Sequence, residues 1–228
     1  MSREDPAGAG QGGLEAYAAL AAHQLGEAVA LIRGATAILD AQRVRLGPGG
    51  EDALRALGAG SDRAQRFVDD LLEVVRAAAE PGEEAPAELD VALDAAIAEL
   101  SMWLERAGVS VRRDPLPAVA LAPSEAERVF VHLLRSALAA GAGRVQVTVA
   151  EAGDPGDGVT VEVLDDGAPP PEGIDPFAPL SRARGRGPLV GAGVGLALCR
   201  RLVERRGGGI ELTRGEERVL VTLRLPTP

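Results

Sequence analysis

The hydrophobic positions of the N-terminal third follow a helical period. Mostly apolar residues recur in alternating steps of four and three between residues 14 and 39, and a second series with these steps runs from residue 54 to residue 78. The two series are Leu14, Ala18, Ala21, Leu25, Ala28, Ile32, Ala35 and Leu39, then Leu54, Leu57, Ser61, Ala64, Val68, Leu71, Val75 and Ala78. A period of 3.5 predicts two long helices, and Gly47-Pro48-Gly49-Gly50 between them predicts a short connection. We therefore expect an antiparallel helical hairpin over residues 14–80. Because a lone hairpin cannot bury its seam on every side, we expect two copies to form a dimeric four-helix bundle.

Two short segments flank this hairpin. Residues 1–13 are polar and glycine-rich without periodicity, which predicts a disordered tail. Residues 81–88 are acidic and contain proline, which predicts a linker. The remaining domain is expected over residues 89–228.

The C-terminal domain mixes helical and strand periods. Helices are expected from Leu89 to Ala107 and from Ser124 to Leu138, the second opened by a capping box of Ser124 and Glu127. Alternating apolar residues predict strands at Val109 and Val111; Val145, Val147 and Val149; Val159, Val161 and Val163; Ile210 and Leu212; and Val219, Val221, Leu223 and Leu225. The chain is therefore predicted to be an α+β protein: a helical hairpin followed by a two-layer sandwich of helices on one face of a sheet.

The composition argues against several classes of function. The formal net charge is −10, which disfavours a general nucleic-acid or anionic-membrane binder. One cysteine and two histidines leave little for a disulfide or a thiolate or histidine metal site. No apolar run reaches the length of a membrane span, and the N-terminus lacks a signal-peptide pattern, so we expect a cytoplasmic protein.

Two features carry candidate chemistry. If Ala18 and Leu25 occupy the a positions of the heptad, His23 falls at f and points away from the bundle axis. It is then either a solvated surface histidine or an imidazole presented to a second protein or domain as nucleophile or proton carrier. Near the C-terminus, Gly191-Ala192-Gly193-Val194-Gly195 opens an amphipathic helix that stops at Gly207-Gly208-Gly209. These glycines form either a flexible turn or a cradle for phosphate oxygens at a helix N-terminus.

The order of the motifs over residues 14–226 resembles the catalytic core of sensor histidine kinases, with an ATP-binding domain of the GHKL superfamily. Ala21 to Val29 is similar to the family's histidine box, and Arg66 to Glu73 looks like its partner helix. Val161 to Gly167 resembles the strand and turn that read adenine. Ile174 to Leu180 resembles the phenylalanine box, and the glycine stretch matches the last glycine-rich box.

The resemblance implies a role for each matching residue. His23 would accept the γ-phosphoryl group of ATP and pass it to an aspartate in the receiver domain of a response regulator. Asp165 would accept a hydrogen bond from the adenine amine; the alternative is an ordinary turn-forming aspartate. The nucleotide site as a whole would comprise His132, Ser136, Asp165, Gly167, Gly191, Gly193, Gly195 and Leu196.

Three departures from the family pattern put the activity in question. The magnesium-binding helix of the family carries an Asn pair, which is replaced here by His132 and Ser136. Ser136 keeps an oxygen that could hold Mg²⁺ weakly or through water, whereas His132 is a poor Mg²⁺ ligand. Gln24 replaces the acid that follows the phosphorylated histidine, which leaves Glu27 as the nearest acidic candidate for general base. Pro169 replaces the second glycine of the adenine turn. The sequence thus predicts either a histidine kinase that autophosphorylates His23, or a degenerate phosphotransferase or binding module with weak or no ATP-dependent activity.

Overall fold

The computed structural model describes residues 25–41, 48–79, 85–150, 158–178, 181, 193–215 and 218–228. The chain divides into two compact units, Met1–Glu80 and Pro81–Pro228. The two units are described separately.

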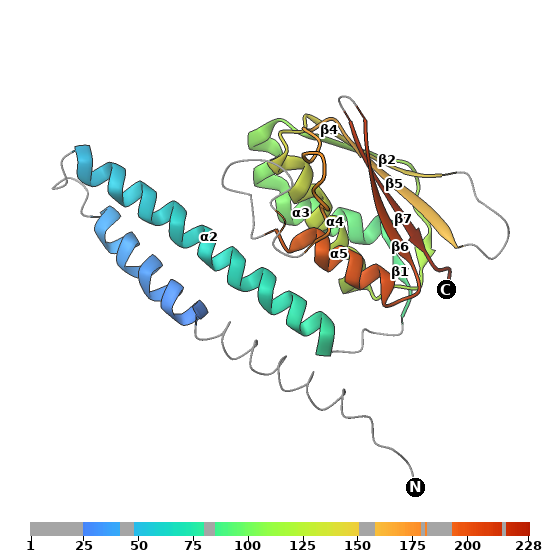
Figure 1. Cartoon of the computed structure of the whole chain (residues 1–228), viewed down its shortest axis with the longest axis horizontal. Helices are drawn as coiled ribbons and strands as arrows, with labels where there is room; N and C mark the ends of the chain where they lie inside the picture. Colours follow the sequence, from blue (N-terminus) through green and yellow to red (C-terminus); the bar gives the residue numbers. More distant parts are fainter. Residues whose placement is uncertain are drawn as a thin grey trace, which may run out of the picture. The chain divides into compact units, whose positions relative to one another are not determined.

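The first unit contains two antiparallel helices, one over residues 25–41 and α2 over Pro48–Ala79 (Figure 1). Proline suits the first turn of α2 because its missing N–H has no partner there in any helix, so α2 begins inside the predicted glycine-proline break. Small residues bring the helices together: a Cβ built on Gly26 lies 3.5 Å from Val68 Cγ1, and one on Gly58 lies 3.7 Å from Thr36 Cγ2.

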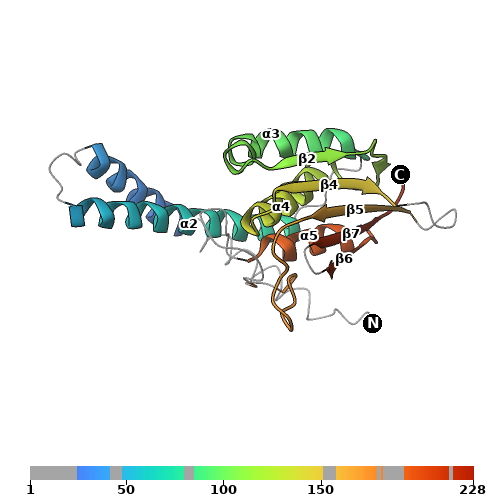
Figure 2. The same cartoon turned by 90° about the horizontal axis from the view of Figure 1, so that it is seen from above.

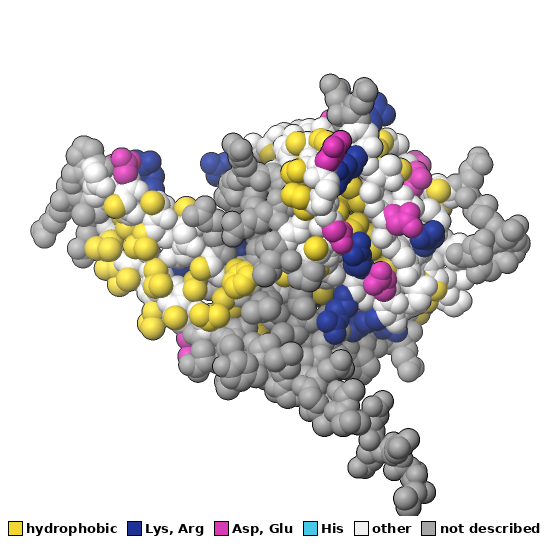
Figure 3. Space-filling view, viewed as in Figure 1, with side chains coloured by type: hydrophobic (Ala, Val, Ile, Leu, Met, Phe, Trp, Pro, Cys, Tyr) yellow, Lys and Arg dark blue, Asp and Glu magenta, His cyan; other side chains and the backbone are white. Residues whose placement is uncertain are grey.

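The predicted seam of the first helix does not face α2. Leu25, Ile32 and Leu39 keep 49%, 45% and 44% of their surface exposed, whereas Val29 and Thr36 are buried. The Thr36 hydroxyl donates to the Ile32 carbonyl oxygen at 2.7 Å, which satisfies this polar group. Hydrophobic side chains accordingly gather on the surface of the hairpin (Figure 3). Within one chain the seam remains an open apolar stripe.

The second unit is built on a five-stranded sheet with the order β2-β4-β5-β7-β6. Strand β2 runs parallel to β4, and every other neighbouring pair is antiparallel. The strands are β2 Ser110–Arg113, β4 Arg144–Val149, β5 Val159–Asp165, β6 Gly209–Arg214 and β7 Val219–Leu225. Two-residue strands β1 (Ala87–Glu88) and β3 (Ala118–Val119), which the sequence did not predict, form a separate antiparallel pair.

Three helices cover one face of this sheet: α3 (Leu89–Ala107), α4 (Pro123–Ala139) and α5 (Gly195–Glu204) (Figures 1 and 2). Helix α4 contacts both α3 and α5. The alternation of the strands sends one set of side chains toward the helices, where they are buried: Val145, Val147, Val161, Val163, Val221 and Leu223. This arrangement confirms the predicted α+β class.

The predicted start of α4 is wrong. The helix begins at Pro123, and Ser124 is exposed rather than acting as a cap. The carboxylate of Glu125 instead accepts a hydrogen bond from the backbone N–H of Ala122 at 3.0 Å. Glu125 also pairs with Arg205 and with Arg206 Nε, the latter at 3.1 Å. Glu125 therefore caps this helix end in place of the predicted Ser124 and Glu127, and the arginines that follow α5 hold its carboxylate there.

Candidate functional site

One face of α4 carries the candidate nucleotide site. His132 and Ser136 lie one helical turn apart, and Ala140 follows one turn later at the end of the helix. His132 is buried, with 6% of its surface exposed, and Ser136 is half-buried. The face thus presents three neighbouring positions to the segments that pack on it.

The start of α5 packs against His132. A Cβ built on Gly195, the first residue of α5, lies 2.7 Å from the Nδ1 atom of His132, so no side chain fits there without movement of the imidazole. Gly193 has a φ of +80°, a conformation that other residues rarely adopt. Leu196 is half-buried on the first turn of α5. The structure therefore brings Gly195, from the predicted glycine box, next to His132, which replaces the first Asn of the pair in the sequence comparison.

The turn after β5 packs against the end of α4. Asp165 is buried, with 3% of its surface exposed, and its Oδ1 accepts the backbone N–H of Gly167 at 2.9 Å. A Cβ on Gly167 lies 2.9 Å from the Ala140 Cβ, and the Ala168 N–H donates to the Ala140 carbonyl at 3.0 Å. Residues predicted to read adenine are thus held beside the helix that carries His132 and Ser136.

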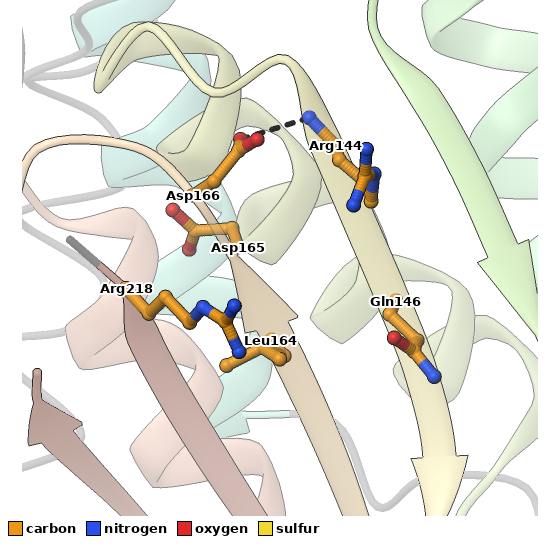
Figure 4. Close-up of a pocket in the computed structure, with 6 residues that line it drawn as sticks. All are labelled: Arg144, Gln146, Leu164, Asp165, Asp166 and Arg218. Atoms are coloured by element: carbon orange, nitrogen blue, oxygen red, sulfur yellow. Dashed lines mark hydrogen bonds between the residues drawn. The ribbon is translucent and has the colours of Figure 1, made fainter.

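The neighbouring Asp166 ties β5 to the start of β4. Its Oδ1 accepts the backbone N–H groups of Gly143 and Arg144 at 2.7 and 2.8 Å (Figure 4). The N–H of Arg144, followed by that of Gly143, holds the pKa of Asp166 below its usual range. The carboxylate therefore stays ionised at neutral pH and holds the end of β5 beside the start of β4.

A cluster around Phe177 was not predicted as a unit. The Asp175 carboxylate accepts the Phe177 N–H at 2.9 Å and pairs with Arg200 of α5 at 3.2 Å. The Phe177 N–H, assisted by Arg200, lowers the pKa of Asp175. The Arg200 guanidinium also lies 4.5 Å from the centre of the buried Phe177 ring, in cation–π geometry. Sequence reasoning found the phenylalanine but missed Arg200; the only available signal was its place five residues after Gly195 on the same helix.

Three further predicted residues stay predictions. His23 and Gly191 fall outside the described residues. Glu27 is exposed on the helix of residues 25–41, in the first unit. Its proposed role beside His23 stays a prediction.

The residues at this site suit a nucleotide better than they suit a magnesium ion. The Asp165 carboxylate supplies an acceptor that suits an adenine amine, and Gly193 has the positive φ expected of a glycine-rich loop before a helix N-terminus, so these residues fit a nucleotide. Mg²⁺ requires oxygen ligands, and of the two replaced positions only Ser136 supplies one. Within the described residues, no group of three or more His, Cys, Asp or Glu side chains could hold a metal ion. The residues present therefore fit ATP better than they fit its usual cation.

Comparison with known proteins agrees with this geometry. Residues 122–228 match the family of histidine kinase-, DNA gyrase B- and HSP90-like ATPases. Curated protein sequences gave no significant match.

Solved structures of histidine kinases share the fold. The catalytic domain of histidine kinase ThkA is 20% identical with a TM-score of 0.53, over 64% of this chain and 96% of that one. Acinetobacter baumannii histidine kinase AdeS is 14% identical with a TM-score of 0.60, over 87% and 95%. Full-length ShkA in complex with AMPPNP is 21% identical with a TM-score of 0.63, over 93% of this chain and 46% of that one.

Residues 122–228 therefore form a domain that is similar to the histidine kinase-, gyrase B- and HSP90-like ATPases. The predicted resemblance to a sensor histidine kinase catalytic core is confirmed by this domain and by the shared fold. No helix in the described part of the chain has both the length and the apolar character needed to cross a bilayer.

Proposed function

We propose that this chain is a histidine kinase-like protein of two-component signalling. It binds ATP in the domain of residues 89–228, phosphorylates His23 and transfers the phosphoryl group to an aspartate of a response regulator. The observation that carries the proposal is the convergence on α4 of two segments far apart in sequence, the Asp165–Gly167 turn and the start of α5 at Gly195.

The side chains divide the work of binding and positioning. The Asp165 carboxylate would accept a hydrogen bond from the exocyclic amine of adenine while its Oδ1 holds the Gly167 N–H, because a carboxylate has several acceptor positions. Gly193 and Gly195 would let the backbone at the start of α5 come close to the phosphates. When bound, ATP supplies the γ-phosphoryl group, and a ring nitrogen of His23 would accept it. Catalysis of this kind depends mainly on positioning and charge stabilisation.

The first test measures nucleotide binding and phosphorylation separately. In calorimetry, we expect ATP to bind the full chain and Asp165→Asn to weaken binding at least about tenfold, since the amide presents one acceptor oxygen where the carboxylate presents two. Asp114→Asn, at an exposed aspartate of the same domain, should bind like the wild type. With γ-labelled ATP, the wild-type chain should acquire an acid-labile label, and the His23→Ala variant should acquire none. Absence of ATP binding by the wild type would contradict the proposal.

A second candidate function rests on the departure at the metal helix. His132 stands where the family has an Asn ligand, and it packs against Gly195. A degenerate phosphotransferase or binding module would follow if this replacement removes ATP-dependent activity. In that case the chain binds ATP without acquiring label, and a phosphorylated regulator transfers label to His23. Label from ATP on His23 would exclude this second candidate.

We also propose that the hairpin forms a homodimer. The open apolar stripe includes Leu25, Ile32 and Leu39, whose exposure in one chain supports a second copy as its cover. Domain limits of 14–80 for the hairpin, 81–88 for the linker and 89–228 for the ATP-binding domain are part of the same proposal.

The dimer can be tested with a charge placed on the stripe. Ile32→Glu should convert a protein of twice the chain mass into a monomer in light scattering, because burying an unpaired carboxylate is strongly unfavourable. The matched variant Ala37→Glu adds the same charge at an exposed position of the same helix off the heptad seam, and it should remain dimeric. If the wild type is a monomer, or if Ile32→Glu stays dimeric, this stripe is not the dimer interface.

A further inference from the structure

Helix α4 contains no carboxylate in the turns that border the proposed nucleotide site. Its two acidic residues, Glu125 and Glu127, both precede Arg128, and the helix then continues to its C-terminus without another Asp or Glu. Apart from His132, the ionisable residues of those turns are Arg128 and Arg135. Because Mg²⁺ binds oxygen ligands and is repelled by other cations, this part of α4 suits an anion better than a metal ion.

The carboxylates next to these turns are committed to the fold. Glu125 is held by the two arginines that follow α5, and only 5% of its side chain is exposed. Asp166 accepts two backbone N–H groups at 2.7 and 2.8 Å, and Asp165 beside it accepts the N–H of Gly167 at 2.9 Å (Figure 4). A move of any of these groups toward a metal ion would cost these contacts.

The imidazole of His132 fills the space beside the start of α5. A Cβ built on Gly195 lies 2.7 Å from Nδ1 and 3.2 Å from Cγ of His132, so not even a methyl group fits between them. Mg²⁺ requires octahedral geometry with ligands at about 2 Å, and it keeps several of its water molecules. A hydrated ion is larger than a methyl group, so it does not fit between His132 and Gly195 either. The half-buried Ser136 leaves one hydroxyl oxygen on this face of α4.

We propose that this chain binds ATP without a divalent cation. The inference rests on the proposed function, ATP binding, and it names the form of the nucleotide that the site accepts. Metal-free ATP carries more negative charge than its magnesium complex. That charge is suited by the arginine-bearing turns of α4 and by the positive end of the α5 dipole, so the protein's own donors replace the ion in binding.

Calorimetric titration of the full wild-type chain with ATP tests the proposal. One buffer contains EDTA and the other saturating magnesium chloride, and sodium chloride equalises their ionic strength because screening would otherwise differ. The dissociation constant in EDTA should be lower than that in magnesium, or higher by no more than about threefold. A larger increase in EDTA would overturn the proposal.

The same pair of titrations separates this inference from the proposed function. If ATP binds in magnesium and not in EDTA, the inference is wrong and the proposed ATP binding stands. If ATP binds in neither buffer, both are wrong.

Substitutions test whether the missing oxygen ligands are the cause. His132→Asn combined with Ser136→Asn places two amide oxygens on this face of α4, so ATP should then bind at least about tenfold more tightly in magnesium than in EDTA. The matched pair His132→Ala with Ser136→Ala removes the same side chains without adding a ligand, and it should bind ATP equally in the two buffers. A metal-dependent alanine pair, or a metal-independent asparagine pair, would overturn the inference.

A single substitution keeps the test open if a double variant does not fold. Ser136→Ala removes the one hydroxyl available to a metal ion from a half-buried position. The ratio of its dissociation constants in EDTA and in magnesium should equal that of the wild type. A loss of affinity of about tenfold or more that occurs only in magnesium would show that Ser136 holds the ion, and the inference would be wrong.

Discussion

Gly195→Ala is expected to weaken ATP binding about tenfold or more and to lower the free energy of unfolding by about 1–3 kcal/mol, the range for overpacking a well-filled interior. The added methyl group would lie 2.7 Å from Nδ1 and 3.2 Å from Cγ of the buried His132, so the imidazole or the start of α5 must move. Calorimetry with ATP and urea unfolding measure the two effects.

The physical cause can be isolated with a second substitution. His132→Ala removes the atoms that the new methyl group meets, so the double variant should recover affinity and stability relative to Gly195→Ala, giving a favourable coupling in a double-mutant cycle. Gly60→Ala is the control, because its Cβ meets nothing within 4 Å and alanine favours helix. A Gly195→Ala protein as stable and as tightly bound to ATP as the wild type would show that this close approach is not required.

The second large effect is expected at Glu125. Glu125→Ala should lower the free energy of unfolding of the C-terminal domain by about 3 kcal/mol, near the lower limit for breaking a buried ion pair. The lower limit applies because the side chains of Arg205 and Arg206 are each 25% exposed, whereas that of Glu125 is 5% exposed. The substitution also leaves the Ala122 N–H without its acceptor at the start of α4.

Urea unfolding followed through the fluorescence of Trp103 measures this effect, since the single tryptophan lies on α3 in the same domain. Glu125→Gln retains an acceptor oxygen for Ala122 but loses the charge, so it should fall between the wild type and the alanine variant. Glu105→Ala removes an exposed carboxylate from α3 and should change stability by less than about 0.5 kcal/mol. If Glu125→Ala unfolds with the same urea midpoint as the wild type, the contacts of Glu125 with Arg205 and Arg206 do not stabilise α4.

Local patterns predicted the elements of this protein well where one periodicity runs without interruption. Helix α3 has the limits expected from its sequence, Leu89 to Ala107. Strands β4, β5 and β7 follow their alternating valines because each buries one face. The two-residue strands β1 and β3 were missed because so short a segment carries no measurable period.

The candidate site was likewise predicted in its parts. The Asp165–Gly167 turn and the glycines at the start of α5 are local motifs, so the sequence alone named them. Contacts between segments far apart were not predictable in this way. The close contact between His132 and Gly195 depends on how α4 packs against α5.

By itself, then, the sequence determined the periods, the turns and the order of motifs, because these depend on neighbours within a few residues. Only the tertiary structure decided which side chains meet. It paired Glu125 with arginines 80 and 81 positions later, set Arg200 over Phe177, and brought Arg144 and Arg218 to one cavity. Such pairs are selected by the packing of helices and the register of strands, and chain spacing encodes neither.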